Sequence, residues 1–398
     1  MNSWSRTKRT AALPALLAAG LVLSGCGSQQ SAAPQEKAAR EKASPSAPAP
    51  VTAPLVTTYD GGLYVLDGET LTISKDIPLA GFNRVNPAGD DRHVLVSTST
   101  GFRVLDASSS QLKEEEFKGA KPGHVVRHAD KTVLFSDGTG EVTIFDPKEL
   151  GNGLPRGEVY KTAAPHHGVA IELENGELVI TLGTEEKRLG IAVLDKDRKE
   201  IARSEKCPGV HGEATARGEI VVIGCEDGVL LYKDSKISKI DSPDEYGRIG
   251  NQAGSEHSTV VLGDYKKDPD AELERPEQIS LIDTESGELK LVNLGTSYTF
   301  RSLARGPHGE ALVLGTDGQI HVIDPEKGEV TKTIKVIDRW EEPMEWQQPR
   351  PTIFVRDRTA YVTDPARKEL HSIDIESGER LRTGTLPESP NELSGVMH

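Results

Sequence analysis

Basic residues are in short supply in this chain of 398 residues. It carries 47 Lys and Arg against 62 Asp and Glu, which gives a formal net charge of −15. Proteins that bind nucleic acid derive much of their affinity from basic groups that meet phosphates. The charge balance therefore argues against a nucleic-acid partner and is compatible with a solvated, exported protein.

Long apolar segments are also lacking. Residues 11–23 form an apolar run of 13 residues that follows Arg6, Lys8 and Arg9 and precedes "LSGC", which ends at Cys26. A permanent membrane helix needs about 20 apolar residues, so this run reads as a cleaved leader. The pattern resembles a bacterial lipoprotein signal peptide over 1–25, with Cys26 lipidated. The alternative is an ordinary secretory signal. We expect an extracytoplasmic chain anchored to the outer face of the cell membrane.

Residues 26–53 contain no aromatic side chain and no histidine, and they are rich in Ala, Pro and Ser. Such a segment buries too little apolar surface to offset the entropy that ordering costs. We therefore expect a lipidated cysteine followed by a flexible tether. The remainder, 54–398, is predicted to be a single domain.

Cysteine is scarce, with only Cys207 and Cys225 after Cys26. In an exported protein such a pair is expected to form a disulfide. The alternative is a pair of thiolate zinc ligands, although the spacing matches no CxxC pattern.

Eight repeats determine the predicted fold. Each contains a β-prone run that ends at an Asp or Lys turn; they begin at Gly62, Gly101, Glu141, Gly190, Gly228, Gln278, Gln319 and Glu369. Repeats of about 43 residues without helical periodicity predict an all-β propeller with eight four-stranded blades. A seven-bladed ring with an insertion is the alternative.

The two ends of the chain are predicted to close the ring. The first repeat lacks an innermost strand, and the C-terminal "NELSGVMH" has the pattern of one with nothing after it. A blade shared by both termini would leave no open sheet edge.

Three glycine–histidine motifs place His124, His167 and His211 at the start of the innermost strand in blades 3, 4 and 5. Strand alternation would point Glu213 to the same side as His211, and His166 away from His167. Three imidazoles and a carboxylate would suit Zn²⁺, with Glu213 and His166 as weaker candidates. Alternatively, these histidines cap backbone groups or hold water in the channel.

The runs "PHHGVAIELENGELVITLG" (165–183) and "CPGVHGEATARGEIVVIGCEDGVLLY" (207–232) resemble the AztD family of exported zinc metallochaperones. The resemblance extends to "YDGGLYVLDG" at Tyr59 and "PNELSGV" at Pro390. It implies a non-enzymatic propeller that binds zinc through His124, His167 and His211. It also implies delivery to the solute-binding protein of a zinc ABC transporter (AztC). We expect a monomer.

Two other functions remain open from the residues alone. A lactonase-like propeller would need a hard-cation site, which Asn83, Asn251, Asn391 and Glu392 could supply. A non-catalytic interaction scaffold would need no metal. Quinoprotein dehydrogenases are disfavoured because their blades carry recurrent tryptophans and this chain has 3. For a zinc carrier, ordinary imidazoles predict an affinity that falls as the pH drops through about 6.

Overall fold

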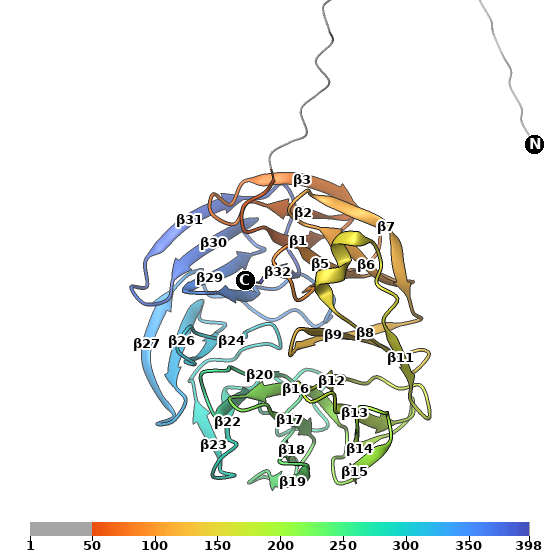
Figure 1. Ribbon diagram of the computed structural model, residues 1–398. Coiled ribbons are helices and arrows are strands. Elements are labelled where there is room, and N and C mark those ends of the chain that lie inside the picture. Colours follow the sequence, from red (N-terminus) through yellow and green to blue (C-terminus); the bar gives the residue numbers. More distant parts are fainter. Residues whose placement is uncertain (1–49, 398) are drawn as a thin grey trace, which may run out of the picture. The chain divides into compact units, whose positions relative to one another are not determined.

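Eight four-stranded antiparallel sheets form a β-propeller in the computed structural model, which describes residues 50–397 (Figure 1). The predicted signal peptide, Cys26 and the tether as far as residue 49 lie outside the described residues. The sheets confirm the prediction of eight blades and exclude the seven-bladed alternative. Within the described residues, no helix is long and apolar enough to cross a membrane.

The strands of each blade are ordered from the innermost to the outermost. Blade 1 contains β32 (Leu393–Gly395), β1 (Leu55–Tyr59), β2 (Gly62–Leu66) and β3 (Ile73–Pro78). Blade 2 contains β4 (Arg84–Pro87), β5 (His93–Ser97), β6 (Gly101–Asp106) and β7 (Gln111–Lys118). Blade 3 contains β8 (Pro122–His128), β9 (Lys131–Ser136), β10 (Glu141–Phe145) and β11 (Glu158–Lys161), with the 3₁₀ helix η1 (Pro147–Asn152) before β11. Blade 4 contains β12 (Ala170–Glu172), β13 (Leu178–Gly183), β14 (Arg188–Leu194) and β15 (Glu200–Ser204).

The other four blades follow the same order. Blade 5 contains β16 (His211–Ala216), β17 (Ile220–Cys225), β18 (Gly228–Lys233) and β19 (Lys236–Asp241). Blade 6 contains β20 (Gln252–Ala253), β21 (Val260–Gly263), β22 (Gln278–Asp283) and β23 (Leu289–Asn293). Blade 7 contains β24 (Leu303–Arg305), β25 (Ala311–Leu314), β26 (Gln319–Asp324) and β27 (Glu329–Lys335). Blade 8 contains β28 (Ile353–Arg356), β29 (Thr359–Asp364), β30 (Glu369–Asp374) and β31 (Arg380–Thr385).

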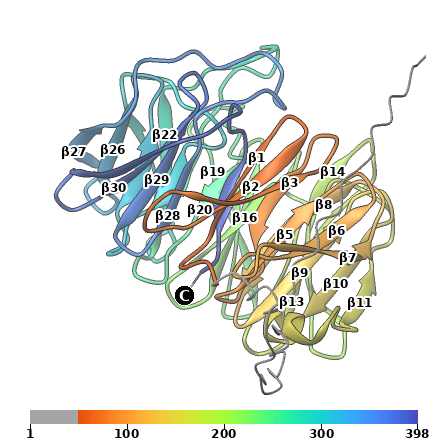
Figure 2. The same cartoon turned by 90° about the horizontal axis from the view of Figure 1, so that it is seen from above.

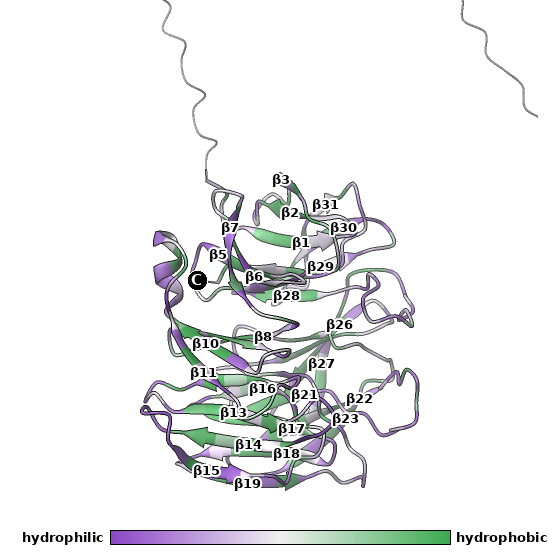
Figure 3. Ribbon diagram, turned by 90° about the vertical axis from the view of Figure 1, so that its right-hand side faces the viewer, coloured by the Kyte–Doolittle hydropathy of each residue, from purple (hydrophilic) through white to green (hydrophobic). Residues whose placement is uncertain are grey.

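Hydropathy changes across each blade. Middle strands such as β2 and β17 are buried along their whole length, whereas outermost strands such as β31 are largely exposed. Figure 3 shows the same change, with apolar strands inside and polar ones at β15 and β19. Middle strands are covered on both faces by neighbouring blades, so they read as continuous apolar runs; outermost strands face water on one side.

The ring closes through the termini, as predicted. β32 pairs antiparallel with β1, with Leu55 opposite Gly395 and Thr57 opposite Leu393. Figure 2 shows the first strands, in orange, beside the last strands, in blue. The last residues of the chain thus complete the blade that the first residues begin.

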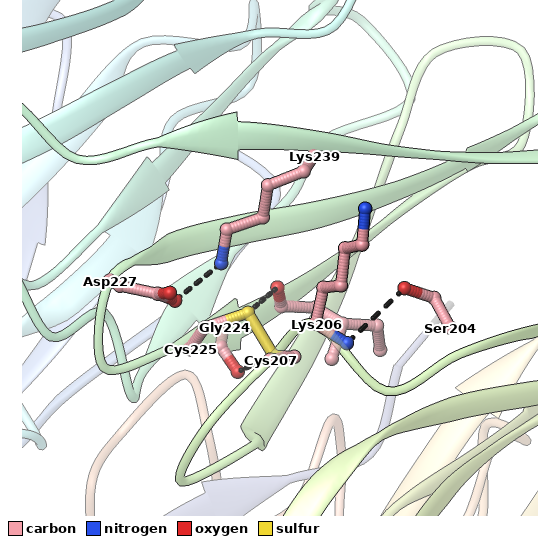
Figure 4. The surroundings of a disulfide bond; sticks show 8 residues. Ser204, Lys206, Cys207, Gly224, Cys225, Asp227 and Lys239 are labelled. Atoms are coloured by element: carbon pink, nitrogen blue, oxygen red, sulfur yellow. Dashed lines mark hydrogen bonds and ion pairs between the residues drawn. A yellow bond between two sulfur atoms is a disulfide. The ribbon is translucent and has the colours of Figure 1, made fainter.

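Cys207 and Cys225 form the predicted disulfide, and both residues are fully buried (Figure 4). The bridge ties the segment before β16 to the end of β17 and so supports the strand that begins at His211. Closing a loop of 18 residues stabilises the fold by about 3 kcal/mol on the chain-entropy model. Because the sulfurs are bonded to each other, they are not zinc ligands.

Candidate metal centre

His124, His167 and His211 come from three neighbouring blades and converge on one point. His124 lies in β8, His167 lies shortly before β12, and His211 begins β16. Their ring centroids are 5.0–5.4 Å apart, and one nitrogen of each ring lies within 4.8 Å of the others. The structure thus brings together the three histidines that the repeat frame aligned.

Irregular strand pairing orients the His124 and His211 rings toward the centre. The register of β8 against β9 shifts between Pro122 and Val125, and that of β16 against β17 shifts between His211 and Glu213. Bulges of this kind redirect side chains and are common next to functional sites. Gly212 lies within the second shift at φ +71°, a conformation that favours glycine.

In two of the rings, the Nδ1 nitrogen donates a hydrogen bond to an acceptor of the protein. His167 Nδ1 donates to Asp137 Oδ2 at 2.5 Å, and His211 Nδ1 donates to the carbonyl oxygen of Gly250 at 2.6 Å. In a neutral ring the proton is then on Nδ1, so Nε2 presents a lone pair. The two Nε2 atoms lie 3.0 Å apart. Two lone pairs at this distance repel each other unless a cation lies between them.

Burial keeps two of the rings neutral. Burial, with the nearby Arg248 guanidinium, lowers the pKa of His211 to about 3. Burial and the neighbouring imidazoles lower the pKa of His124 well below its ordinary value. The His167 side chain is 45% exposed, so the centre is reached from solvent through that ring. Nitrogen donors from His124 and His211 are therefore available near neutral pH.

Glu213 does not join this group. Strand alternation predicted that it would share a side with His211, but the register shift between the two residues breaks that alternation. Burial also raises the pKa of Glu213 to about 8, against the opposing effect of Arg127. The carboxyl group is therefore largely protonated at neutral pH and is a poor ligand.

His166 has a structural position. Its side chain is buried against the ring of Phe135. Its Nδ1 donates to the carbonyl oxygen of Ala164 at 2.9 Å, and its Nε2 lies 3.0 Å from Thr181 Oγ1. Because both ring nitrogens are engaged in the protein, neither is free to bind a metal ion.

Comparison with known proteins finds similar chains. No family model matches the chain. A curated protein of Citrobacter koseri, the zinc chaperone AztD, is 28% identical over 302 residues, 73% of this chain and 69% of the relative. The chain is thus similar to AztD over most of its length. This finding confirms the resemblance predicted from the sequence.

Solved structures show that the fold is shared. Two structures of C. koseri AztD, one of them the apo form, superpose with TM-scores of 0.73 and 0.74 at 23% identity; each covers 86% of this chain and 96% of AztD. The dihydro-heme d1 dehydrogenase NirN superposes with a TM-score of 0.58 at 14% identity, over 87% of this chain and 76% of NirN. This likeness concerns the propeller alone.

The alternative cation site is not formed on this AztD-like propeller. The Glu392 carboxylate accepts from Arg301 Nη2 at 2.7 Å and from Arg84 Nε at 3.3 Å. The Asn251 side chain donates to Asp264, and that of Asn83 donates to backbone carbonyls. Because two guanidinium groups already neutralise the carboxylate, these residues do not make a site for a hard cation.

Asp137 contacts one of the three histidines and was not predicted from the sequence. It follows β9 in blade 3, yet it holds His167 of blade 4, and its Oδ1 also accepts from the backbone N–H of Gly168 at 3.3 Å. Room for the carboxylate comes from Gly123, where an added Cβ would lie 2.2 Å from Asp137 Oδ1. Blade 7 also has an Asp, Asp317, in the turn between its second and third strands, so an Asp in this turn does not by itself distinguish Asp137.

Replacing Asp137 with alanine should lower zinc affinity about 10- to 100-fold, because His167 would lose the acceptor that fixes its ring and its tautomer. Competition with a chromophoric zinc chelator measures the change. The control is Asp317→Ala, in the turn after β25 of blade 7, where the carboxylate likewise lies beside a histidine, 3.1 Å from His321 Nε2. Equal affinities for the two variants would contradict the positioning role.

Proposed function

We propose that this protein binds Zn²⁺ at the three-histidine centre and carries it outside the cytoplasm to a partner protein. The main support is the pair of anchored imidazoles whose Nε2 lone pairs face each other at 3.0 Å, with His124 beside them. Three nitrogen donors leave one position of a tetrahedral zinc ion for water or for a ligand from a partner. Zinc is here the cargo, and no catalytic role is proposed.

The charges around the centre oppose tight binding of a cation and so favour its release. Arg248 and Arg188 act on His211, and Arg84 and Arg188 act on His124, in each case disfavouring positive charge. The same guanidinium groups repel a bound zinc ion. A carrier benefits from a site with good ligand geometry whose affinity is limited by nearby cations.

The partner is proposed to be the solute-binding protein of a zinc ABC transporter, an AztC-like protein. The relative from C. koseri is named a zinc chaperone, and a chaperone needs a recipient. The disulfide fits an oxidising compartment outside the cytoplasm. A lipid at Cys26 would hold the carrier beside a membrane transporter and raise its effective concentration there.

Direct transfer of zinc to a recipient protein distinguishes a carrier from a protein that only stores zinc and from an interaction scaffold. We expect zinc to pass from the loaded protein to a metal-free solute-binding protein faster than it passes to a small chelator that traps spontaneously released zinc. The rate should rise with recipient concentration, because ligand exchange requires a complex. A rate equal to that of spontaneous dissociation would refute delivery, and a protein that binds no zinc would refute the whole proposal.

Zinc binding should persist at acidic pH. The lowered pKa values of His211, about 3, and of His124 keep both rings unprotonated well below their ordinary range. Three ordinary imidazoles of pKa about 6.5 would lose roughly a thousandfold in affinity between pH 7.5 and 5.5. We expect a much smaller loss in pH-corrected competition titrations, because two of the three rings stay unprotonated. A thousandfold loss would contradict the argument that burial keeps the rings neutral. It would instead support the prediction from the sequence that zinc affinity falls as the pH drops through about 6.

A further inference from the structure

We propose that blade 8 holds a second metal site, formed by Asp364, Glu369 and His371, for one divalent transition-metal ion. The site shares no residue with the three-histidine centre, and the inference does not depend on the proposed function.

The hairpin of β29 and β30 brings the three residues together. Asp364 ends β29 and lies opposite Glu369, the first residue of β30. His371 is two residues further along β30, on the same face as Glu369. One ligand atom of each lies within 4.8 Å of the others, and all three line a cavity of about 130 Å³. The cavity also borders the end of β27 in blade 7.

The donor atoms in this cavity are poorly satisfied. The His371 side chain is 2% exposed, and its Nδ1 lies 3.0 Å from Thr383 Oγ1. Its Nε2 is 3.6 Å from Glu369 Oε2, too far for a hydrogen bond. Asp364 Oδ1 accepts from the backbone N–H of Arg367, but Oδ2 is 3.9 Å from Arg367 Nε. His371 Nε2 thus has no hydrogen bond among the described contacts, and a metal ion in the cavity would supply a partner for it.

The basic side chains around the cavity are engaged elsewhere. Arg367 pairs with Asp338, Arg380 donates to the carbonyl oxygen of Val336, and Lys335 donates to that of Asp317 at 2.8 Å. Arg367 approaches Asp364 only at 3.9 Å, and no described ion pair joins Arg380 or Lys335 to Asp364 or Glu369. Their charges will make this site weaker than the three-histidine centre. One imidazole and two carboxylates suit Zn²⁺, Co²⁺ or Mn²⁺.

Blade 7 supplies an internal comparison. His321 occupies the position in β26 that His371 occupies in β30, and both are buried. In blade 7, however, Asp317 Oδ2 lies 3.1 Å from His321 Nε2, so that nitrogen has a partner. The repeat therefore places a histidine in both blades, and only blade 8 leaves its Nε2 open beside two carboxylates.

The test uses the full chain with His124, His167 and His211 replaced by alanine, so that the first centre cannot contribute. Titration with Co²⁺ should give one bound equivalent with visible d–d absorption. Adding His371→Ala should weaken this binding at least tenfold, whereas the matched change His321→Ala should leave it unchanged. Asp364→Asn, which keeps the side-chain shape, should weaken it as well.

Thermal melting establishes that each variant is folded before binding is compared. The proposal is overturned if the triple variant binds no cobalt at any concentration at which it stays folded. It is also overturned if His371→Ala and His321→Ala bind equally. Because the first centre is absent from every variant, these outcomes are independent of whether the protein delivers zinc.

Discussion

Replacing His124, His167 or His211 with alanine is expected to lower zinc affinity more than about 100-fold. Mutating a residue that only supports a metal ligand costs up to roughly 100-fold, and here the ligand itself is lost. Each variant leaves two imidazoles, and the lost nitrogen has no substitute because Glu213 lies outside the group. The measurement is bound zinc after gel filtration, followed by competition titration of whatever binding remains. The fold should survive, because the three rings are not part of the apolar core.

The neighbouring histidine provides the control. His166→Ala should still bind one equivalent of zinc at the three-histidine centre, since both nitrogens of His166 are used inside the protein. It should also melt at a lower temperature, because a buried side chain with two polar contacts and an aromatic neighbour is lost. If His166→Ala lost zinc while His167→Ala kept it, the assignment of the tandem pair would be reversed.

The fold could be predicted from the sequence because its information is local. Each repeat carries its own strand pattern, and counting the repeats predicted eight blades. The strand patterns at the two ends of the chain predicted the shared first blade. The three histidines could be aligned for the same reason, since each occupies the same place in its repeat. The disulfide needed only the number of cysteines and the compartment.

The remaining features of the site depend on departures from the repeat. Glu213 was predicted to share a side with His211, but a bulge follows His211. The residue types in the sequence do not reveal this bulge. Asp137 was missed because it acts across a blade boundary on a residue 30 positions away. The group around His371 was missed because it depends on which of two equivalent histidines, His321 or His371, has an Nε2 without a hydrogen bond to a carboxylate.

Ending the chain after Ser389 should prevent cooperative folding. The deletion removes β32, so β1 loses its partner at the inner edge of blade 1. It also removes Leu393 and Val396 from the core, at about 1.5–3 kcal/mol each. Arg301, itself buried, loses the Glu392 carboxylate 2.7 Å away, and breaking a buried ion pair costs about 3–5 kcal/mol. The sum approaches the roughly 5–15 kcal/mol that holds a typical domain together.

Thermal melting by circular dichroism and limited proteolysis would show the effect. Glu392→Gln separates the ion pair from the strand: it keeps β32 and should lower the melting temperature without abolishing the transition. Adding a peptide of residues 390–398 to the truncated chain should restore part of the protection, because the missing strand can pair with β1 from outside. A truncated chain that melts within a few degrees of the full protein would mean that the ring closes without its last strand.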